Sequence, residues 1–215
     1  MVVRNDAKRL KGGIYWNDDD RVYRYKQSDR KLSNKQLYRV VRQELKIAEN
    51  KAEQLTNRFV NGNLSFEDWQ RRLIERTRNT HINLLRLGRG GKDKTYAIHY
   101  LTVGRDLKDY HYKHFQDFAL HIKLGDLTPK QIIHRSKLYV RSARVQFEYG
   151  RSTIEGEISA EVKALRKLGA CGNHCPECIR YAGLGYVSLV DLILPTQQCS
   201  CKMNCCCSVE YSRSA

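Results

Sequence analysis

Cysteine is the residue type whose spacing in this chain most clearly predicts chemistry. The segment Cys175-Pro-Glu-Cys178 holds two thiols in one short turn, the spacing that lets two sulfurs bind one tetrahedral zinc ion at about 2.3 Å each. After 22 intervening residues, the run that starts at Cys201 can supply the other ligands. A metal that closes such a loop contributes folding energy to a segment too small to bury its own core. The candidate ligands are Cys175, Cys178, Cys201, Cys205 and Cys207.

Structural Zn²⁺ is the predicted cofactor, although two other states of the thiols stay open. Disulfides and free buried thiols are the alternatives, and metal is favoured because paired cysteines of an intracellular chain more often bind metal. Among the three consecutive cysteines at 205–207, Cys206 is the one that we expect not to bind the metal, since side chains of adjacent residues rarely point at one ion. Cys171 and Cys199 lie outside the simplest pattern, and His174 could replace a thiolate or donate a hydrogen bond to one.

No catalytic role is expected for this site. A catalytic zinc needs three protein ligands, an open position and a nearby general base. Glu177 is the only carboxylate within the first cysteine pair, and the H-x-E with P-C-x-x-C arrangement of zinc deaminases is absent. We therefore expect a structural site in a non-enzymatic protein.

Positive charge dominates the rest of the chain. Lysine and arginine exceed aspartate and glutamate by 16, and residues 171–215 carry no net charge, so the whole excess lies in residues 1–170. Such an excess indicates an anionic partner, commonly nucleic acid. Five basic residues share one side of a predicted helix, and they are Lys130, Lys137, Arg141, Arg144 and Arg151. A solvated helix face is the simplest interpretation, with contact to DNA phosphates or to a protein partner as the alternatives.

Apolar residues recur at three- and four-residue spacing through most of the chain, which predicts helices. The expected spans are 33–60, 65–88, 95–124 and one long helix over 128–167. Gly104 is expected to interrupt the third span, while Gly150 and Gly156 could bend the fourth or let another backbone approach it. No strand alternation predicts a sheet. The expected fold class is mainly α, a helical body with long helices and a small zinc-stapled C-terminal module.

These patterns divide the chain into an N-terminal arm at 1–32, a helical body at 33–170 and a cysteine-rich zinc-binding module at 171–215. The arm is expected to hold at most a short strand or hairpin, where Trp16 could contact a partner. Trp69 lies on an apolar stripe and is expected in the core. No apolar run approaches the roughly 20 residues that a bilayer span requires, so no membrane contact is expected.

The C-terminal pattern resembles that of tailed-phage minor head proteins, the head morphogenesis proteins encoded near the portal. The matching features are the C-x-x-C pair at 175–178, the Gly and Leu stretch at 183–189, the cysteine at 201, the N-C-x-C at 204–207 and the acidic-aromatic pair at 210–211. Upstream, segments 63–70, 103–119 and 127–149 also fit the family, so the resemblance covers roughly residues 20–211. The cysteines at 171, 199 and 206 depart from its pattern.

The resemblance implies a non-enzymatic virion protein, a minor capsid or head morphogenesis component that binds capsid, portal or neck subunits. It also implies assembly in the cytoplasm of the bacterial host and membership of a symmetric, multi-copy particle. The basic surface would then face packaged DNA or acidic patches on capsid subunits. The alternative function is a zinc-stabilised nucleic-acid-binding protein that contacts DNA through the basic helix face.

Overall fold

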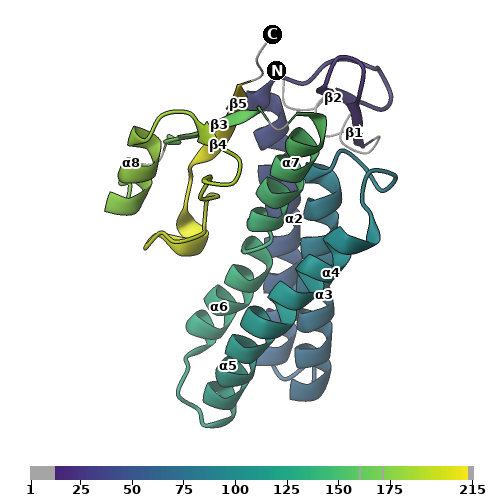
Figure 1. Ribbon diagram of the computed structural model, residues 1–215. Helices are drawn as coiled ribbons and strands as arrows, with labels where there is room; N and C mark the ends of the chain where they lie inside the picture. Colours follow the sequence, from purple (N-terminus) through teal and green to yellow (C-terminus); the bar gives the residue numbers. More distant parts are fainter. Residues whose placement is uncertain (1–12, 160, 171, 213–215) are drawn as a thin grey trace, which may run out of the picture.

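The computed structural model describes residues 13–159, 161–170 and 172–212 of the chain (Figure 1). Long helices form its body and confirm the prediction of a mainly α fold. They are α2 (Asn34–Val60), α3 (Phe66–Gly88), α4 (Ala97–Asp106), the π-helical segment η1 (Leu107–Tyr112), α5 (Lys113–Lys123), α6 (Pro129–Arg141) and α7 (Arg144–Ile158). Within these described ranges, none of the helices has the length and apolar composition that a bilayer span requires.

Side-chain caps begin two of these helices where the sequence predicts them. Ser33 Oγ accepts the backbone N–H of Gln36 at the start of α2, and the Gln36 side chain accepts the Ser33 N–H at 2.8 Å. Thr128 and Gln131 form the same capping box at the start of α6, where Pro129 takes the first helical position. Such caps satisfy backbone donors that a first helical turn leaves unpaired. Both helix starts are therefore encoded locally.

The span 128–167 is not one helix, and this prediction is wrong. α6 ends at Arg141, and the chain passes through Ser142 and Ala143 with i→i+3 backbone hydrogen bonds that tighten the turn. α7 then ends at Ile158. Helical spacing of apolar residues continued beyond this point in the sequence, but the chain there turns away to form a strand.

Glycine lets two helices of the bundle approach closely. A Cβ on Gly150 of α7 would lie 2.6 Å from the carbonyl oxygen of Leu85, and one on Gly88 of α3 would lie 2.2 Å from that of Phe147. Both separations are shorter than any real side-chain contact, so α3 and α7 pack at a distance that only glycine permits. The expectation of a close backbone approach is thus confirmed at Gly150. Gly104 lies inside α4, and the irregularity expected there occurs three residues later, at η1.

Trp69 lies at the centre of one core cluster, as expected. Its side chain is fully buried, and its Nε1 donates to Thr56 Oγ1 at 3.1 Å. Its ring stacks on Phe59 with a centroid distance of 4.8 Å and on Phe115 at 5.9 Å. The cluster joins α2, α3, α5 and α6.

Residues 13–32 belong to the helical body rather than to a free arm. β1 (Ile14–Asn17) and β2 (Val22–Tyr25) form an antiparallel hairpin in which Trp16 lies opposite Tyr23. Trp16 is only 3% exposed and shares a core cluster with Leu37 of α2. The expectation that Trp16 contacts a partner is wrong, because the protein's own core covers it. Residues 1–12 of the predicted arm lie outside the described residues.

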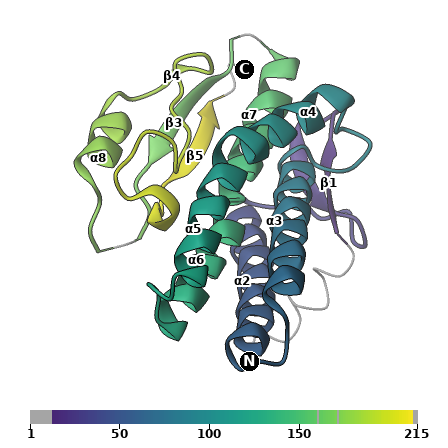
Figure 2. The same cartoon turned by 90° about the horizontal axis from the view of Figure 1, so that it is seen from below.

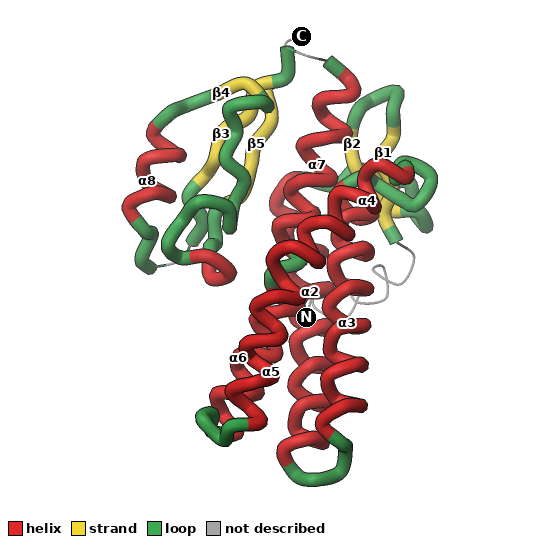
Figure 3. The backbone as a smooth tube through the Cα atoms, turned by 60° about the horizontal axis from the view of Figure 1, so that its bottom comes forward, coloured by secondary structure: helices red, strands yellow, loops and turns green. Residues whose placement is uncertain are grey.

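A small antiparallel sheet supports the cysteine module. β3 (Lys163–Lys167) is its central strand, between β4 (Val187–Ser188) and β5 (Ser208–Ser212), and α8 (Pro176–Gly183) precedes β4. These strands are too short to show an alternation in the sequence, which is why no sheet was expected. Because β3 pairs with β5, the module begins directly after α7, earlier than the predicted boundary at 171. Figures 2 and 3 show the sheet beside α7, on the side away from the β1–β2 hairpin.

Candidate metal centre

Six cysteines of the C-terminal module come together in one cluster. Four are buried and two lie half-buried at its edge, and the six are Cys175, Cys178, Cys199, Cys201, Cys205 and Cys207. All of them are free thiols. They come from the start of α8, from the 199–201 stretch and from the 205–207 stretch just before β5. The cysteine cluster, defined by these six residues, confirms that the module could hold a metal.

Short local elements explain why these thiols meet. Cys175 is the N-cap of α8 and Pro176 takes the first helical position, so Cys178 falls in the first turn of the helix. A short 3₁₀ turn, η2 (Lys202–Asn204), separates Cys201 from Cys205. The sulfurs on both sides of this turn lie within 4 Å of Cys178 Sγ.

The separations between sulfur atoms fit metal ligands. Cys201 Sγ lies 3.5 Å from the Sγ atoms of Cys175, Cys178 and Cys199, and Cys178 Sγ lies 3.7 Å from Cys205 Sγ. Tetrahedral coordination with Zn–S bonds of about 2.3 Å places neighbouring sulfurs about 3.8 Å apart. A disulfide requires about 2.05 Å. The arrangement supports metal ligation and excludes disulfides among these six thiols.

All five predicted ligands belong to the cluster, but the prediction missed a sixth. Two groups of thiols are close enough to hold an ion, and they are Cys175, Cys178, Cys199 and Cys201 in the first, and Cys178, Cys205 and Cys207 in the second. Cys199 was expected outside the pattern. Its signal in the sequence is the spacing Cys199-Ser-Cys201, which repeats the C-x-C of 205–207.

Cys206 and His174 lie outside both groups. His174 Nε2 is 3.0 Å from the carbonyl oxygen of Gly169, and its Nδ1 is 3.8 Å from Cys206 Sγ. Cys206 is disulfide-bonded, so it is not the spare thiol that the sequence predicts in the final run. The placement of His174 gives no support to this histidine as a ligand in place of a thiolate. Cys171 lies outside the described residues.

A buried arginine faces the sulfurs. Arg166 of β3 is 2% exposed, and its Nη2 donates to Cys178 Sγ at 3.2 Å and to Cys205 Sγ at 3.4 Å. A buried guanidinium is costly without a negative partner, so the contact with Arg166 favours a thiolate at Cys205. A hydrogen bond with the Cys207 thiol, assisted by the charge of Arg166, lowers the pKa of Cys205. Nothing in the sequence distinguished Arg166 from the surface lysines beside it.

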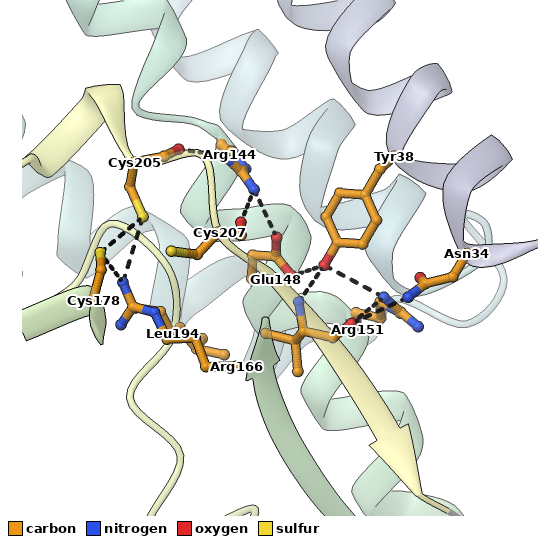
Figure 4. A network of polar contacts seen from close by, with 11 residues as sticks. Asn34, Tyr38, Arg144, Glu148, Arg151, Arg166, Cys178, Leu194, Cys205 and Cys207 are labelled. Carbon is orange, nitrogen blue, oxygen red and sulfur yellow. Dashed lines mark hydrogen bonds and ion pairs between the residues drawn. The ribbon is translucent and has the colours of Figure 1, made fainter. Parts of the chain in front are cut away.

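Arginines of α6 and α7 hold the end of the cluster that leads into β5. Arg144 donates to the backbone carbonyl oxygens of Cys205 and Cys207 (Figure 4). Arg141 donates to Asn204 Oδ1 at 3.1 Å. All three bonds cross between the helical body and the module, so the helices fix the segment that carries two of the thiols.

A second set of buried contacts attaches β5 itself to the bundle (Figure 4). Tyr38 Oη of α2 accepts the Val209 N–H at 2.8 Å and donates to Glu148 Oε2 at 2.8 Å. Arg151 Nη1 donates to the Val209 carbonyl oxygen at 3.1 Å. Tyr38, Glu148 and Arg151 therefore form a polar clasp, and this clasp binds both backbone groups of Val209. Hydrogen bonds to charged groups in such a buried setting are stronger than exposed ones.

Most residues of the predicted basic stripe form ion pairs or hydrogen bonds with other parts of the protein. Lys137 and Arg141 form ion pairs with glutamates of α2, both at 2.8 Å. Arg144 bonds to the cysteine backbone, and Arg151 is only 7% exposed. The prediction of a solvated side chain open to phosphates is therefore wrong for Arg151, because the cysteine module packs over it. The helical spacing of the basic residues could not reveal this packing. Lys130 is exposed at the start of α6.

The chemistry available to the cluster is metal binding through sulfur. Four thiolates can fill the coordination shell of one Zn²⁺ ion, which stabilises a small module by tying together segments distant in sequence. Glu177, the carboxylate nearest in sequence to the first cysteine pair, accepts a hydrogen bond from Ser200 Oγ at 2.9 Å.

Comparison with known proteins does not identify this chain. No protein-family model, curated protein or solved structure matches it at significant similarity.

Proposed function

We propose that this chain is a non-enzymatic structural protein whose metal-bound cysteine module is a docking unit in the head of a tailed phage. The observation that carries the proposal is the convergence of the motif cysteines. The five cysteines through which the sequence resembles minor head proteins all lie in one cluster. A motif that builds one compact centre is more specific than a set of scattered residues.

The rigid attachment of the module supports a role in assembly. Arg144 and the polar clasp fix the module to helices of the body at several points. A metal adds folding energy where the apolar core is small. The module therefore presents its outer surface in a defined orientation, which a docking unit needs.

Exposed apolar side chains on the module offer a surface for a protein partner. Val190 is 95% exposed, and Ile179 and Leu184 are 55% and 59% exposed. Large apolar side chains left in solvent often mark protein interfaces. Under this proposal they contact capsid, portal or neck subunits, and Zn²⁺ is the structural ion.

The proposal predicts that the chain is a component of purified phage particles. Denaturing gels and mass spectrometry of gradient-purified particles should detect the wild-type chain in a fixed ratio to the portal protein. Cys178→Ser should abolish incorporation, because Cys178 belongs to both thiol groups. Ser200→Ala changes an exposed residue between the cysteines and is the matched control. Absence of the wild-type chain from mature and immature particles would overturn the proposal.

A groove between α2 and α3 favours nucleic-acid binding as the second candidate function. Its charged residues sum to a net charge of +2, and they are Lys51, Arg58, Arg72, Arg76, Glu44 and Glu75. Arg76 Nε is buried there without a hydrogen-bond partner among the described residues. A phosphate oxygen in the groove would supply such a partner.

The salt dependence of DNA binding tests this second candidate. The slope of log affinity against log salt should be about 0.9 for each phosphate neutralised on duplex DNA. Replacing both Arg72 and Arg76 with Gln should lower the slope, whereas Lys130→Gln on α6 should leave it unchanged. Absence of binding at low salt would eliminate this candidate.

A further inference from the structure

The cysteine cluster holds more thiols than one ion can use. A tetrahedral Zn²⁺ takes four protein ligands, and the first thiol group supplies four by itself: Cys175, Cys178, Cys199 and Cys201. Cys205 and Cys207 are left over, yet both are buried and both lie close to Cys178. Surplus thiols would be expected at the edge of the cluster rather than at its centre.

Cys178 is the only member common to the two groups. Its side chain is 1% exposed, and its Sγ lies 3.5 Å from Cys201 Sγ in one group and 3.7 Å from Cys205 Sγ in the other. Both separations are close to the edge of a tetrahedron of Zn–S bonds, about 3.8 Å. One sulfur is thus at ligand distance from both sets.

We propose that the module binds two divalent metal ions that share the Cys178 thiolate. Cys175, Cys178, Cys199 and Cys201 hold the first ion, and Cys178, Cys205 and Cys207 hold the second. This inference rests on the proposed metal-bound module and specifies its content. Six thiols with one shared fill seven of the eight tetrahedral positions, and a solvent molecule completes the second ion.

The charges around the second group fit this assignment. Six thiolates and two divalent ions carry a net charge of −2, and Arg166 reduces it to −1. Its Nη2 donates both to the shared sulfur and to Cys205 Sγ. Partners that hydrogen-bond to metal ligands orient them and stabilise their charge. Arg144 bonds to the backbone carbonyl oxygens of Cys205 and Cys207, and it thereby fixes the backbone from which these two ligands extend.

The second ion would connect the cysteine cluster to the helical body. Cys207 directly precedes β5, and β5 carries Val209, which the polar clasp of Tyr38, Glu148 and Arg151 binds. The first ion ties α8 to the 199–201 stretch, while the second adds the segment that is bonded to α7. Loss of the second ion should therefore loosen β5 without releasing α8.

Metal stoichiometry tests the inference on the full chain. Protein purified under reducing conditions with zinc should contain two ions per chain by elemental analysis and native mass spectrometry. Cys207→Ser should contain one ion, because it removes a ligand of the second ion alone. Cys178→Ser should contain less than one, and Ser200→Ala should keep two. In the cadmium-substituted wild type, NMR should show two metal resonances coupled through the shared sulfur.

The outcomes separate this inference from the proposal beneath it. A wild-type protein without metal would overturn the metal-bound module itself. One ion in the wild type would overturn the two-ion inference and leave the module intact. Two ions in both the wild type and Cys207→Ser would reject the ligand assignment. The wild-type ion count decides the question even where a variant fails to fold.

Discussion

Replacing Tyr38 with phenylalanine should loosen the attachment of the cysteine module to the bundle. The Tyr38 hydroxyl accepts the Val209 N–H and donates to Glu148 Oε2, each at 2.8 Å. Phenylalanine keeps the ring, including its edge-to-face contact with Phe147 at a centroid distance of 5.6 Å. The substitution removes only the oxygen, so it isolates these two hydrogen bonds together with a longer one that the hydroxyl accepts from Arg151 Nη1 at 3.4 Å.

The structure sets the expected size of this effect. Losing a neutral hydrogen bond costs about 1 kcal/mol, and losing one to a charged group costs about 1.5–3 kcal/mol. Both partners of Tyr38 are buried, so water does not replace the lost bonds in the folded state. The free energy of detaching β5 from the bundle should fall by about 2–4 kcal/mol. Since 1.4 kcal/mol is a factor of ten, amide exchange at Val209 should accelerate on the order of 30- to 1,000-fold.

Hydrogen exchange followed by NMR measures this opening directly, because the Val209 N–H is donated to Tyr38. Tyr186→Phe is the matched control, since its hydroxyl forms an exposed hydrogen bond with Glu210 Oε1 at 2.7 Å. That variant should change stability by less than about 0.5 kcal/mol. Equal exchange at Val209 in the wild type and a folded Tyr38→Phe would refute the argument that the clasp attaches the module.

Three further predictions concern the bundle and the metal. Gly150→Ala should destabilise the protein by about 1–2 kcal/mol in urea unfolding, since overpacking at the contact with α3 outweighs the gain in helix propensity. Gly104→Ala, where nothing lies within 4 Å of the added Cβ, should instead stabilise it by up to about 1 kcal/mol; equal effects would contradict the close approach of α3 and α7. Burial lowers the pKa of His81 to about 3 and that of His111 to about 4. The unfolded chain therefore takes up protons below pH 6.5 that the folded protein does not, and each histidine should cost about 1.4 kcal/mol of stability per pH unit between pH 6.5 and about 4. Urea midpoints at pH 7 and pH 5 check this, and a midpoint that does not fall at pH 5 would contradict it. Chelation of the metal should leave most of the helical circular dichroism intact while exposing the cysteine module to protease, and a module that stays resistant would indicate that metal does not support it.

Local patterns in the sequence predicted much of the helical body. The capping boxes at Ser33 and Thr128 act between residues three positions apart, so they are visible without tertiary information. The apolar stripe around Trp69 likewise reflects a property of single helices, one buried face. The break between α6 and α7 had no such signal, because apolar spacing continued across it.

The sequence predicted that the ligands of the site are cysteines, but it identified only five of the six cysteines in the cluster. Cysteine spacing indicated metal, because two thiols in one turn can bind one ion with little rearrangement. Cys199 was missed, since a linear pattern cannot say which of several thiols fold onto the same point. Arg151 was assigned to the surface for a related reason. Its position in the helical repeat is typical of a solvated face, and only the packing of the module over this face makes Arg151 buried.

By itself, the sequence determined the mainly helical body and a set of cysteines near the C-terminus that could hold a metal, since both depend on short-range spacing. The tertiary structure alone decided which six thiols meet, that Arg166 faces their sulfurs, and that arginines of α6 and α7 hold the module. The physical reason is that a charged or thiol side chain has the same local pattern whether it ends in solvent or in a buried contact. Its partner, brought from a distant segment by folding, determines which of the two it becomes.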